Sequence, residues 1–280
     1  MEQLRRFKCI FGIIIFCLSF LSKASAIHIE NLWIGGNSSG GEIAATDYSA
    51  LSSCKGYWKM DDTGNELDDS TVGSQDDLTE TSGTIPVATA SPPTGFTGSY
   101  RTFADIDTER LEHADGGSTD ISGESASITL FIRFQYVTDT AADMRLISKY
   151  RAAAGQRQYS LFYDDSEDNI KGFIRDSADS ATTSTSGTDT TMNDGNWHTA
   201  ALVCNNTDIR LYADGVLDNT PAAHTSGILD GTLSFAIGAQ GDFTSEEFDG
   251  NIYEAGIWDV ALSAEQILEM HNNGINGAKN

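Results

Sequence analysis

The stretch from residue 194 to residue 216 restricts the fold more than any other part of the chain. Within it, residues 197–204 and 209–213 form two runs whose alternate side chains share a face when the chain is extended. Turn-forming residues at 205–208 and at 214–215 follow the two runs. Two hairpins so close together predict an antiparallel meander.

Shorter apolar runs separated by turn residues recur along the chain. The clearest is residues 126–136, where every second side chain is apolar and most of the intervening ones are polar, as in a strand with one buried and one solvated face. Further strands are predicted at residues 56–60, 100–103, 110–113, 145–150, 158–163, 170–175, 233–237 and 251–259. Residues 178–193, rich in Ser and Thr, are predicted to form a solvated edge strand or a loop.

The last element is predicted to be a short helix. Ser263 and Gln266 have the spacing of a capping box, and Gly274 stands where a C-cap is expected. Ile267, Leu268 and Met270 supply its apolar side. About a dozen strands and one closing helix predict an all-β fold of two packed antiparallel sheets.

The beginning of the chain has the pattern of a secretory signal. Three basic residues, Arg5, Arg6 and Lys8, precede an apolar run at 9–21 and a small-residue site at 24–26. The alternative is a membrane anchor, but the apolar run is shorter than the roughly 20 residues that span a bilayer. We therefore expect residues 1–26 to be cleaved and the protein to be secreted, either extracellular or at the cell surface.

Residues 27–53 are predicted to be an extended N-terminal segment, residues 54–276 one domain, and residues 277–280 a tail. The apolar segment 27–34 is followed by a glycine-rich tether. Such a strand can lie on its own domain or add to the sheet edge of a neighbouring copy, so one expectation is a homo-oligomer formed through residues 27–34.

The chain is strongly acidic, with a formal net charge of −24. Removal of residues 1–26 leaves 13 Lys and Arg against 40 Asp and Glu, a net charge of −27. A surface of this charge repels nucleic acid and anionic membranes, so we expect neither as a partner, and it favours cations. Selection for solubility is the alternative explanation.

Four cysteines are present, and Cys9 and Cys17 leave with the signal. The remaining pair, Cys54 and Cys204, predicts one disulfide in an exported protein. Two buried thiols are the alternative, because Cys204 lies in a predicted strand where any small apolar residue would serve.

Several short motifs occur in a characteristic order. They are Tyr-Trp-Lys-Met-Asp-Asp at 57–62, Ile-Ser-Lys-Tyr at 147–150, Asp-Gly-Asn-Trp-His at 194–198, Leu-Tyr-Ala-Asp-Gly at 211–215, Ile-Gly at 237–238, Phe-Asp-Gly-Asn-Ile-Tyr-Glu at 248–254 and Ala-Leu-Ser-Ala-Glu-Gln-Ile at 261–267. In this order the chain resembles the laminin G-like domains of the concanavalin A-like lectin/glucanase superfamily. The resemblance implies a jelly-roll sandwich and, for most members, a non-catalytic module that binds carbohydrate or protein, often with a structural calcium ion.

An acidic loop at residues 61–77 offers oxygen ligands on a segment with glycines that permit bends. Calcium takes six to eight oxygens from such loops. The resemblance assigns Asp69-Ser70 and Glu254 to the family's metal site, although Tyr253 stands where Asp is usual. The expected calcium ligands are Asp61, Asp62, Asn65, Asp69 and Glu254, and the alternative is a solvated acidic turn.

No catalytic residues are predicted. A retaining glycosidase needs two carboxyl groups about 5 Å apart. Glu247 and Asp249 begin the Glu-x-Asp-x-x-Glu pattern of the superfamily's glucanases, but Ile252 occupies the third acidic position. The five histidines are scattered without zinc-ligand spacing, and no Gly-x-Ser-x-Gly elbow occurs.

Sugar binding requires exposed aromatic side chains beside hydrogen-bonding groups. Trp58, Trp197 and Trp258 occupy strand positions that predict core packing. The freer candidates are Trp33, Tyr100, Tyr163 and Tyr212, among which the sequence does not choose. We therefore predict a secreted, non-enzymatic module that binds carbohydrate or a protein partner. The alternatives are a structural subunit of a surface or virion-associated assembly and a glycan hydrolase.

Overall fold

The meander predicted around residue 197 forms the centre of a nine-stranded antiparallel sheet. The computed structural model describes residues 45–70, 76–81, 83–104, 109–136, 142–153, 155–241 and 246–277. The signal predicted at residues 1–26 and the segment predicted at residues 27–34 lie outside these described residues. All elements below belong to the compact unit that begins at Ala44.

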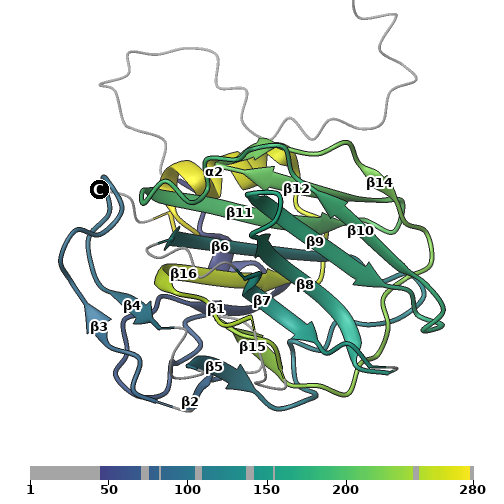
Figure 1. Cartoon of the computed structure of the whole chain (residues 1–280), viewed down its shortest axis with the longest axis horizontal. Coiled ribbons are helices and arrows are strands. Elements are labelled where there is room, and N and C mark those ends of the chain that lie inside the picture. The colour runs from purple at the N-terminus through teal and green to yellow at the C-terminus, as the bar shows by residue number, and fades with distance from the viewer. Residues whose placement is uncertain are drawn as a thin grey trace, which may run out of the picture. The chain divides into compact units, whose positions relative to one another are not determined.

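Two antiparallel sheets pack face to face (Figure 1). The nine-stranded sheet runs β13 (Val216–Leu217), β12 (Asp208–Ala213), β11 (Trp197–Cys204), β6 (Ile128–Tyr136), β16 (Gly250–Trp258), β4 (Tyr100–Phe103) and β3 (Val87–Ala88), with β1 (Cys54–Trp58) on β16 and β14 (Ala222–Ala223) on β12. The seven-stranded sheet runs β10 (Thr182–Ser186), β9 (Asn169–Arg175), β8 (Arg157–Asp164), β7 (Met144–Tyr150), β15 (Phe235–Ile237), β5 (Arg110–His113) and β2 (Thr79–Thr81). The predicted all-β, two-sheet antiparallel jelly-roll architecture is confirmed.

The main core lies between the sheets. Alternate residues of β6, Ile128, Leu130, Ile132 and Phe134, are fully buried in it, as the sequence pattern predicts. Gly172 of β9 lies against this core, where an added Cβ would come within 2.8 Å of Leu202. The close approach explains why that position carries glycine.

A second apolar cluster lies on the outer face of the nine-stranded sheet. It contains Phe131 of β6, Trp258 of β16, and Ile267 and Met270 of α2 (Ala264–Asn273), the helix drawn in yellow in Figure 1. The prediction that one face of β6 is solvated is therefore wrong. The helix and the short 3₁₀ turn η1 (Tyr48–Ala50) cover that face, and strand periodicity cannot show such a cover.

The helix begins and ends where the sequence predicts. Ser263 is the N-cap of a complete capping box with Gln266, and Gly274 closes the last turn with its N–H donating to Met270 O. Ile267 and Met270 are buried as expected. Leu268 is exposed, so its assignment to the apolar side is wrong.

The predicted disulfide between Cys54 and Cys204 is wrong, because both cysteines are free and buried. Three strand spacings separate β1 from β11, or about 14 Å. A disulfide needs Cα atoms closer than about 7 Å. The two thiols also lie on opposite faces of the sheet, Cys54 under the helix and Cys204 in the main core. Burial raises the pKa of Cys54 to about 12 and that of Cys204 to about 11.

Candidate ligand-binding site

The acidic loop assembles only part of the expected calcium set. Asp61 and Asp62 lie with Glu66, and the ligand oxygens of the three are all within 4.8 Å of one another. Glu66 was not among the expected ligands. It is fully buried, and its Oε1 accepts a hydrogen bond from Asp61 N at 3.2 Å.

The other three expected ligands have different partners. Asn65 Oδ1 accepts from Glu80 N at 3.3 Å. Asp69 Oδ1 pairs with Lys59 Nζ at 2.9 Å. Glu254 pairs through Oε1 with Arg133 Nε at 3.0 Å and through Oε2 with Ile275 N at 3.1 Å. The structure therefore separates Asp69 and Glu254 from the group that contains Asp61 and Asp62.

A buried arginine occupies the inside of the acidic loop. Arg101 of β4 donates from Nε to Glu66 Oε2 at 2.7 Å and from Nη1 to Glu80 Oε2 at 2.7 Å. Its Nη2 donates to the carbonyl oxygens of Asp62 and Gly64 at 2.6 and 2.7 Å, and Nη1 also reaches Ile85 O at 3.4 Å. These five contacts match the five N–H donors of a guanidinium group. The chain thus supplies its own cation to this loop.

The ion pair with Arg101 opposes the effect of burial on Glu66. Burial raises the pKa of Glu66, Arg101 lowers it, and the outcome is a pKa raised to about 7. A buried carboxylate of this kind depends on its partner for ionisation. The contacts of Arg101 therefore make this loop a stabilising element of the fold.

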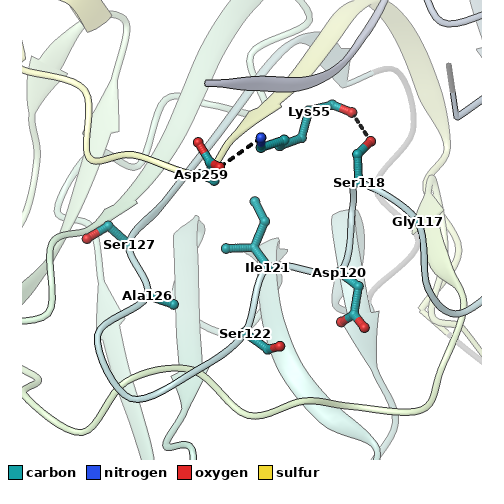
Figure 2. A pocket seen from close by; sticks show the side chains of 9 residues that line it. All are labelled: Lys55, Gly117, Ser118, Asp120, Ile121, Ser122, Ala126, Ser127 and Asp259. Atoms are coloured by element: carbon teal, nitrogen blue, oxygen red, sulfur yellow. Dashed lines mark hydrogen bonds and ion pairs between the residues drawn. The ribbon is translucent and has the colours of Figure 1, made fainter. Parts of the chain in front are cut away.

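A cavity of about 440 Å³, here called the Lys55 pocket, opens between β1, the end of β16 and the segment before β6. Its lining residues are Lys55, Gly117, Ser118, Asp120, Ile121, Ser122, Ala126, Ser127 and Asp259. Figure 2 shows Ile121 between Asp120 and the Lys55–Asp259 pair, whose Nζ and Oδ2 atoms are 2.8 Å apart. Asp120 pairs in turn with Lys149 Nζ at 2.7 Å. No aromatic side chain is among the residues that line it, and its charged groups already have partners.

A second cavity, of about 370 Å³, lies on the outer face of the nine-stranded sheet and is here called the Trp197 pocket. Its lining residues are Pro93, Thr94, Phe96, Arg133, Gln135, Asn196, Trp197 and His271. Gln135 is eight residues along the chain from Ser127 of the Lys55 pocket, so these two lining residues are about 26 Å apart in an extended chain.

Trp197 forms the aromatic wall of this pocket. Its ring centroid lies 5.3 Å from that of Tyr100 and 6.3 Å from that of Tyr253, both edge-on, and Nε1 donates to Ser91 O at 3.1 Å. The side chain is only half-buried, so the prediction of core packing is wrong for Trp197 and confirmed for Trp58 and Trp258. Its position directly after an Asp-Gly-Asn turn, at the first residue of a strand, is the sequence signal that places it at a rim.

Arg133, Gln135 and Asn196 are among the polar side chains that line the pocket with Trp197. Arg133 stacks 4.3 Å above the Phe96 ring and donates from Nη2 to Met270 O and His271 O at 3.0 and 2.8 Å. Its Nη1 has no hydrogen-bond partner among the described residues. Gln135 and Asn196 complete the set. An aromatic wall beside a few fixed polar groups is the usual composition of a small-molecule site.

Glu254 and three of the four candidate aromatic residues are buried. Glu254 has 1% of its surface exposed and both oxygens are engaged, so it is not available as a glycosidase acid. Tyr100, Tyr163 and Tyr212 are buried, so their prediction as freer aromatics is wrong, and Trp33 lies outside the described residues. Within the described part of the chain, no helix combines the length and apolar character needed to cross a bilayer.

Comparison with known proteins identifies a family by sequence. A family model of the laminin G type, described as the concanavalin A-like lectin/glucanases superfamily, matches residues 109–268. This is more than half of the 280-residue chain. No curated protein sequence matches the chain.

Solved structures share the fold at low sequence identity. The binding domain of Paraclostridial mosquitocidal protein 1 is 12% identical with a TM-score of 0.57, over 81% of this chain and 53% of that one. The binding domain of botulinum neurotoxin DC, solved in complex with rat synaptotagmin II, is 12% identical with a TM-score of 0.56, over 79% of this chain and 51% of that one. Domain 4 of an extracellular arabinanase from Geobacillus stearothermophilus, in complex with arabinotriose, is 17% identical with a TM-score of 0.50, over 78% of this chain and 98% of that one. The chain spans about half the length of the toxin domains it matches.

Proposed function

The chain belongs to the concanavalin A-like lectin/glucanase superfamily, and we propose that it is a secreted, non-catalytic module that binds neutral carbohydrate in the Trp197 pocket. The observation that carries the proposal is the half-buried Trp197 in one pocket with Arg133, whose Nη1 has no hydrogen-bond partner in the part of the chain that the structure describes. The signal pattern at residues 1–26 supports secretion.

The composition of the pocket suits a sugar. The apolar faces of sugar rings stack on aromatic rings, and Trp197 offers its ring at the rim of the cavity. Sugar hydroxyls need fixed hydrogen-bonding groups, which Arg133, Gln135 and Asn196 provide. The volume of about 370 Å³ lies within the range of roughly 300 to 1,000 Å³ typical of ligand pockets.

The charge around the pocket favours a neutral ligand over an anionic one. The positive charge of Arg133 is compensated by Glu254 at 3.0 Å, so it offers hydrogen bonds without a net charge. The whole chain carries a net charge of −24, which disfavours the approach of uronate or sulfated sugars. The arabinanase domain of the same fold was solved with arabinotriose, a neutral oligosaccharide, which makes that sugar a suitable first probe.

Calorimetric titration with arabinotriose and a panel of neutral and uronate oligosaccharides tests the proposal. We expect at least one neutral sugar to bind the full chain, and Trp197→Ala to weaken that binding by about thirtyfold, the effect of losing an aromatic hot spot. Ser122→Ala in the Lys55 pocket is the matched control and should bind like the wild type. Binding that survives Trp197→Ala, or that is confined to anionic sugars, would contradict it.

A structural subunit of an assembly is the second candidate, and an exposed apolar patch favours it. Val216 and Leu217 of β13 are 64% and 45% exposed, and Leu268 of α2 is 42% exposed. An added Cβ at Gly215 would come within 2.9 Å of Leu268, so the helix and this strand are adjacent. In this case a second copy of the chain covers the patch. Leu217→Lys should then shift sedimentation from oligomer to monomer, and a wild type that is monomeric at all concentrations excludes the candidate.

Calcium binding is a separate proposal for the acidic loop. Asp61 is exposed and Asp62 is half-buried, whereas Glu66 and the carbonyls of Asp62 and Gly64 are engaged by Arg101. This leaves fewer protein ligands than the six to eight that calcium prefers. We therefore propose a weak site with a small effect on stability, which thermal unfolding with and without a chelator tests.

A further inference from the structure

The imidazole of His198 in β11 lies between two carboxylates, next to the turn that leads to Trp197. Its Nδ1 lies 2.9 Å from Asp214 Oδ2 and its Nε2 lies 3.0 Å from Asp194 Oδ1. A carboxylate only accepts hydrogen bonds, and a neutral imidazole has a single N–H to donate. Both contacts are hydrogen bonds only when His198 carries two protons. The geometry is therefore that of an imidazolium ion.

The charged surroundings of His198 stabilise the same state. Asp194 comes from the turn before β11 and Asp214 from the turn after β12, while β6 contributes the uncharged Phe134 ring at 6.4 Å. The imidazole of His271 in α2 is the next titratable group, with Nδ1 3.9 Å from Asp214 Oδ1. Burial lowers the pKa of His198, but the hydrogen bonds and charges of Asp214 and Asp194 outweigh it and raise the pKa to about 8.

Asp194 connects His198 to the Trp197 pocket. Its Oδ1 accepts from Asn196 N and its Oδ2 from Asn196 Nδ2, both at 2.8 Å. The same turn is held from β6 by Gln135 Nε2, which donates to Gly195 O at 2.7 Å. Asn196 and Trp197 both line the pocket. The position of these two side chains therefore depends on Asp194, and Asp194 depends on His198.

We propose that protonated His198 is the positioning residue of the Trp197 pocket, and that the pocket loosens and binds more weakly when His198 loses its proton. The statement about binding rests on the proposed carbohydrate function. The statement about the pocket does not, since it concerns the exposure of Trp197 in the free protein. On deprotonation, one ring nitrogen loses its N–H and one aspartate loses its hydrogen bond.

His224 provides a matched control within the same chain. It is buried to a similar degree, but its ring nitrogens contact Thr183 Oγ1 at 2.9 Å and Gly227 O at 2.6 Å, neither of which is charged. A neutral imidazole satisfies both contacts, so the protonation state of His224 should not affect the turn that leads to Trp197. His224→Gln should therefore keep the pH response of the wild type.

Acrylamide quenching of tryptophan fluorescence between pH 6 and 9.5 tests the proposal without a ligand, with Trp197→Phe subtracted to isolate Trp197. In the wild type and in His224→Gln, quenching should rise with a midpoint near pH 8. In His198→Gln it should be high and independent of pH. In Asp194→Asn the midpoint should move to lower pH. If arabinotriose binds, its affinity should fall by about threefold or more between pH 7 and pH 9 in the wild type and in His224→Gln, but not in His198→Gln.

Two results would overturn the proposal. One is wild-type quenching that stays constant across this range, or that follows the same curve in His198→Gln. The other is an NMR titration of the wild-type imidazoles in which His198 loses its proton at or below its ordinary pKa of about 6.5, a measurement that needs no variant to fold. Failure of every sugar to bind would remove the proposed function and leave the quenching result to decide the role of His198.

Discussion

The acidic loop around Arg101 and the Trp197 pocket differ in what they leave unpaired. In the loop, the guanidinium group of Arg101 makes five hydrogen bonds to side-chain and backbone oxygens. In the pocket, Arg133 leaves Nη1 without a partner among the described residues, and the ring of Trp197 is half-buried. A dense group of charges that satisfy one another stabilises the fold, whereas a sparse group with open positions is suited to a ligand. Charge density alone selects the loop, whereas open hydrogen-bonding positions select the pocket.

The largest expected effect is on the loop. Arg101→Met should lower the free energy of unfolding by about 3–5 kcal/mol, because it leaves Glu66 buried without its cation. Urea denaturation measures this. Arg210→Met is the control, because its pair with Asp208 is partly exposed and should contribute less than about 1 kcal/mol. A loss from Arg101→Met no larger than that of the control would remove the distinction between the loop and the pocket.

The second prediction compares the stability lost on substituting a core tryptophan with that lost on substituting the tryptophan of the pocket. Trp258→Ala removes a fully buried ring and should cost about 3–5 kcal/mol of unfolding free energy. Trp197→Ala should cost about 1 kcal/mol, since its ring is half-buried and packs by its edges on Tyr100 and Tyr253. Equal losses in urea denaturation would show that Trp197 is a core residue, as the sequence pattern predicts.

The pH dependence of stability separates the two regions further. The pKa of His198 is raised to about 8, so its contribution is complete below the unfolded-state pKa near 6.5 and is lost as the pH rises through 8. We expect the wild type to lose about 1 to 2 kcal/mol over that window and His198→Gln to lose less. Urea denaturation at pH 6 and pH 9 measures the difference, and a wild type that is equally stable at both contradicts it.

The smallest expected effect concerns calcium. Because Arg101 already engages Glu66 and two backbone carbonyls of the loop, chelation should lower the thermal midpoint by less than about 2 °C. Asp61→Asn should remove whatever shift occurs. A large drop in the thermal midpoint with chelator, not reproduced by salt, would show that the loop depends on a bound ion. The loop would then be a ligand site, as the pocket is proposed to be.

The sequence predicts the strands well where the signal is local. The predicted runs at 100–103 and 110–113 coincide with β4 and β5, and the capping residues Ser263 and Gln266 mark the start of the helix. Residue spacing determines these features, since strand periodicity and a capping box depend only on neighbours in the chain. The position of the site could not be predicted in this way. Its lining residues come from β6, from α2, from the turn before β11 and from a proline-containing loop near residue 93.

The sequence by itself determined the fold class, the family and the buried positions of Trp58 and Trp258. Only the tertiary structure decided that Cys54 and Cys204 lie on opposite faces of one sheet, that Arg101 fills the acidic loop, and that Trp197 faces a cavity. The physical reason is that alternation states which side chains share a face of a strand. Which element covers that face, and which charged side chain contacts it, depends on contacts between residues far apart in the sequence.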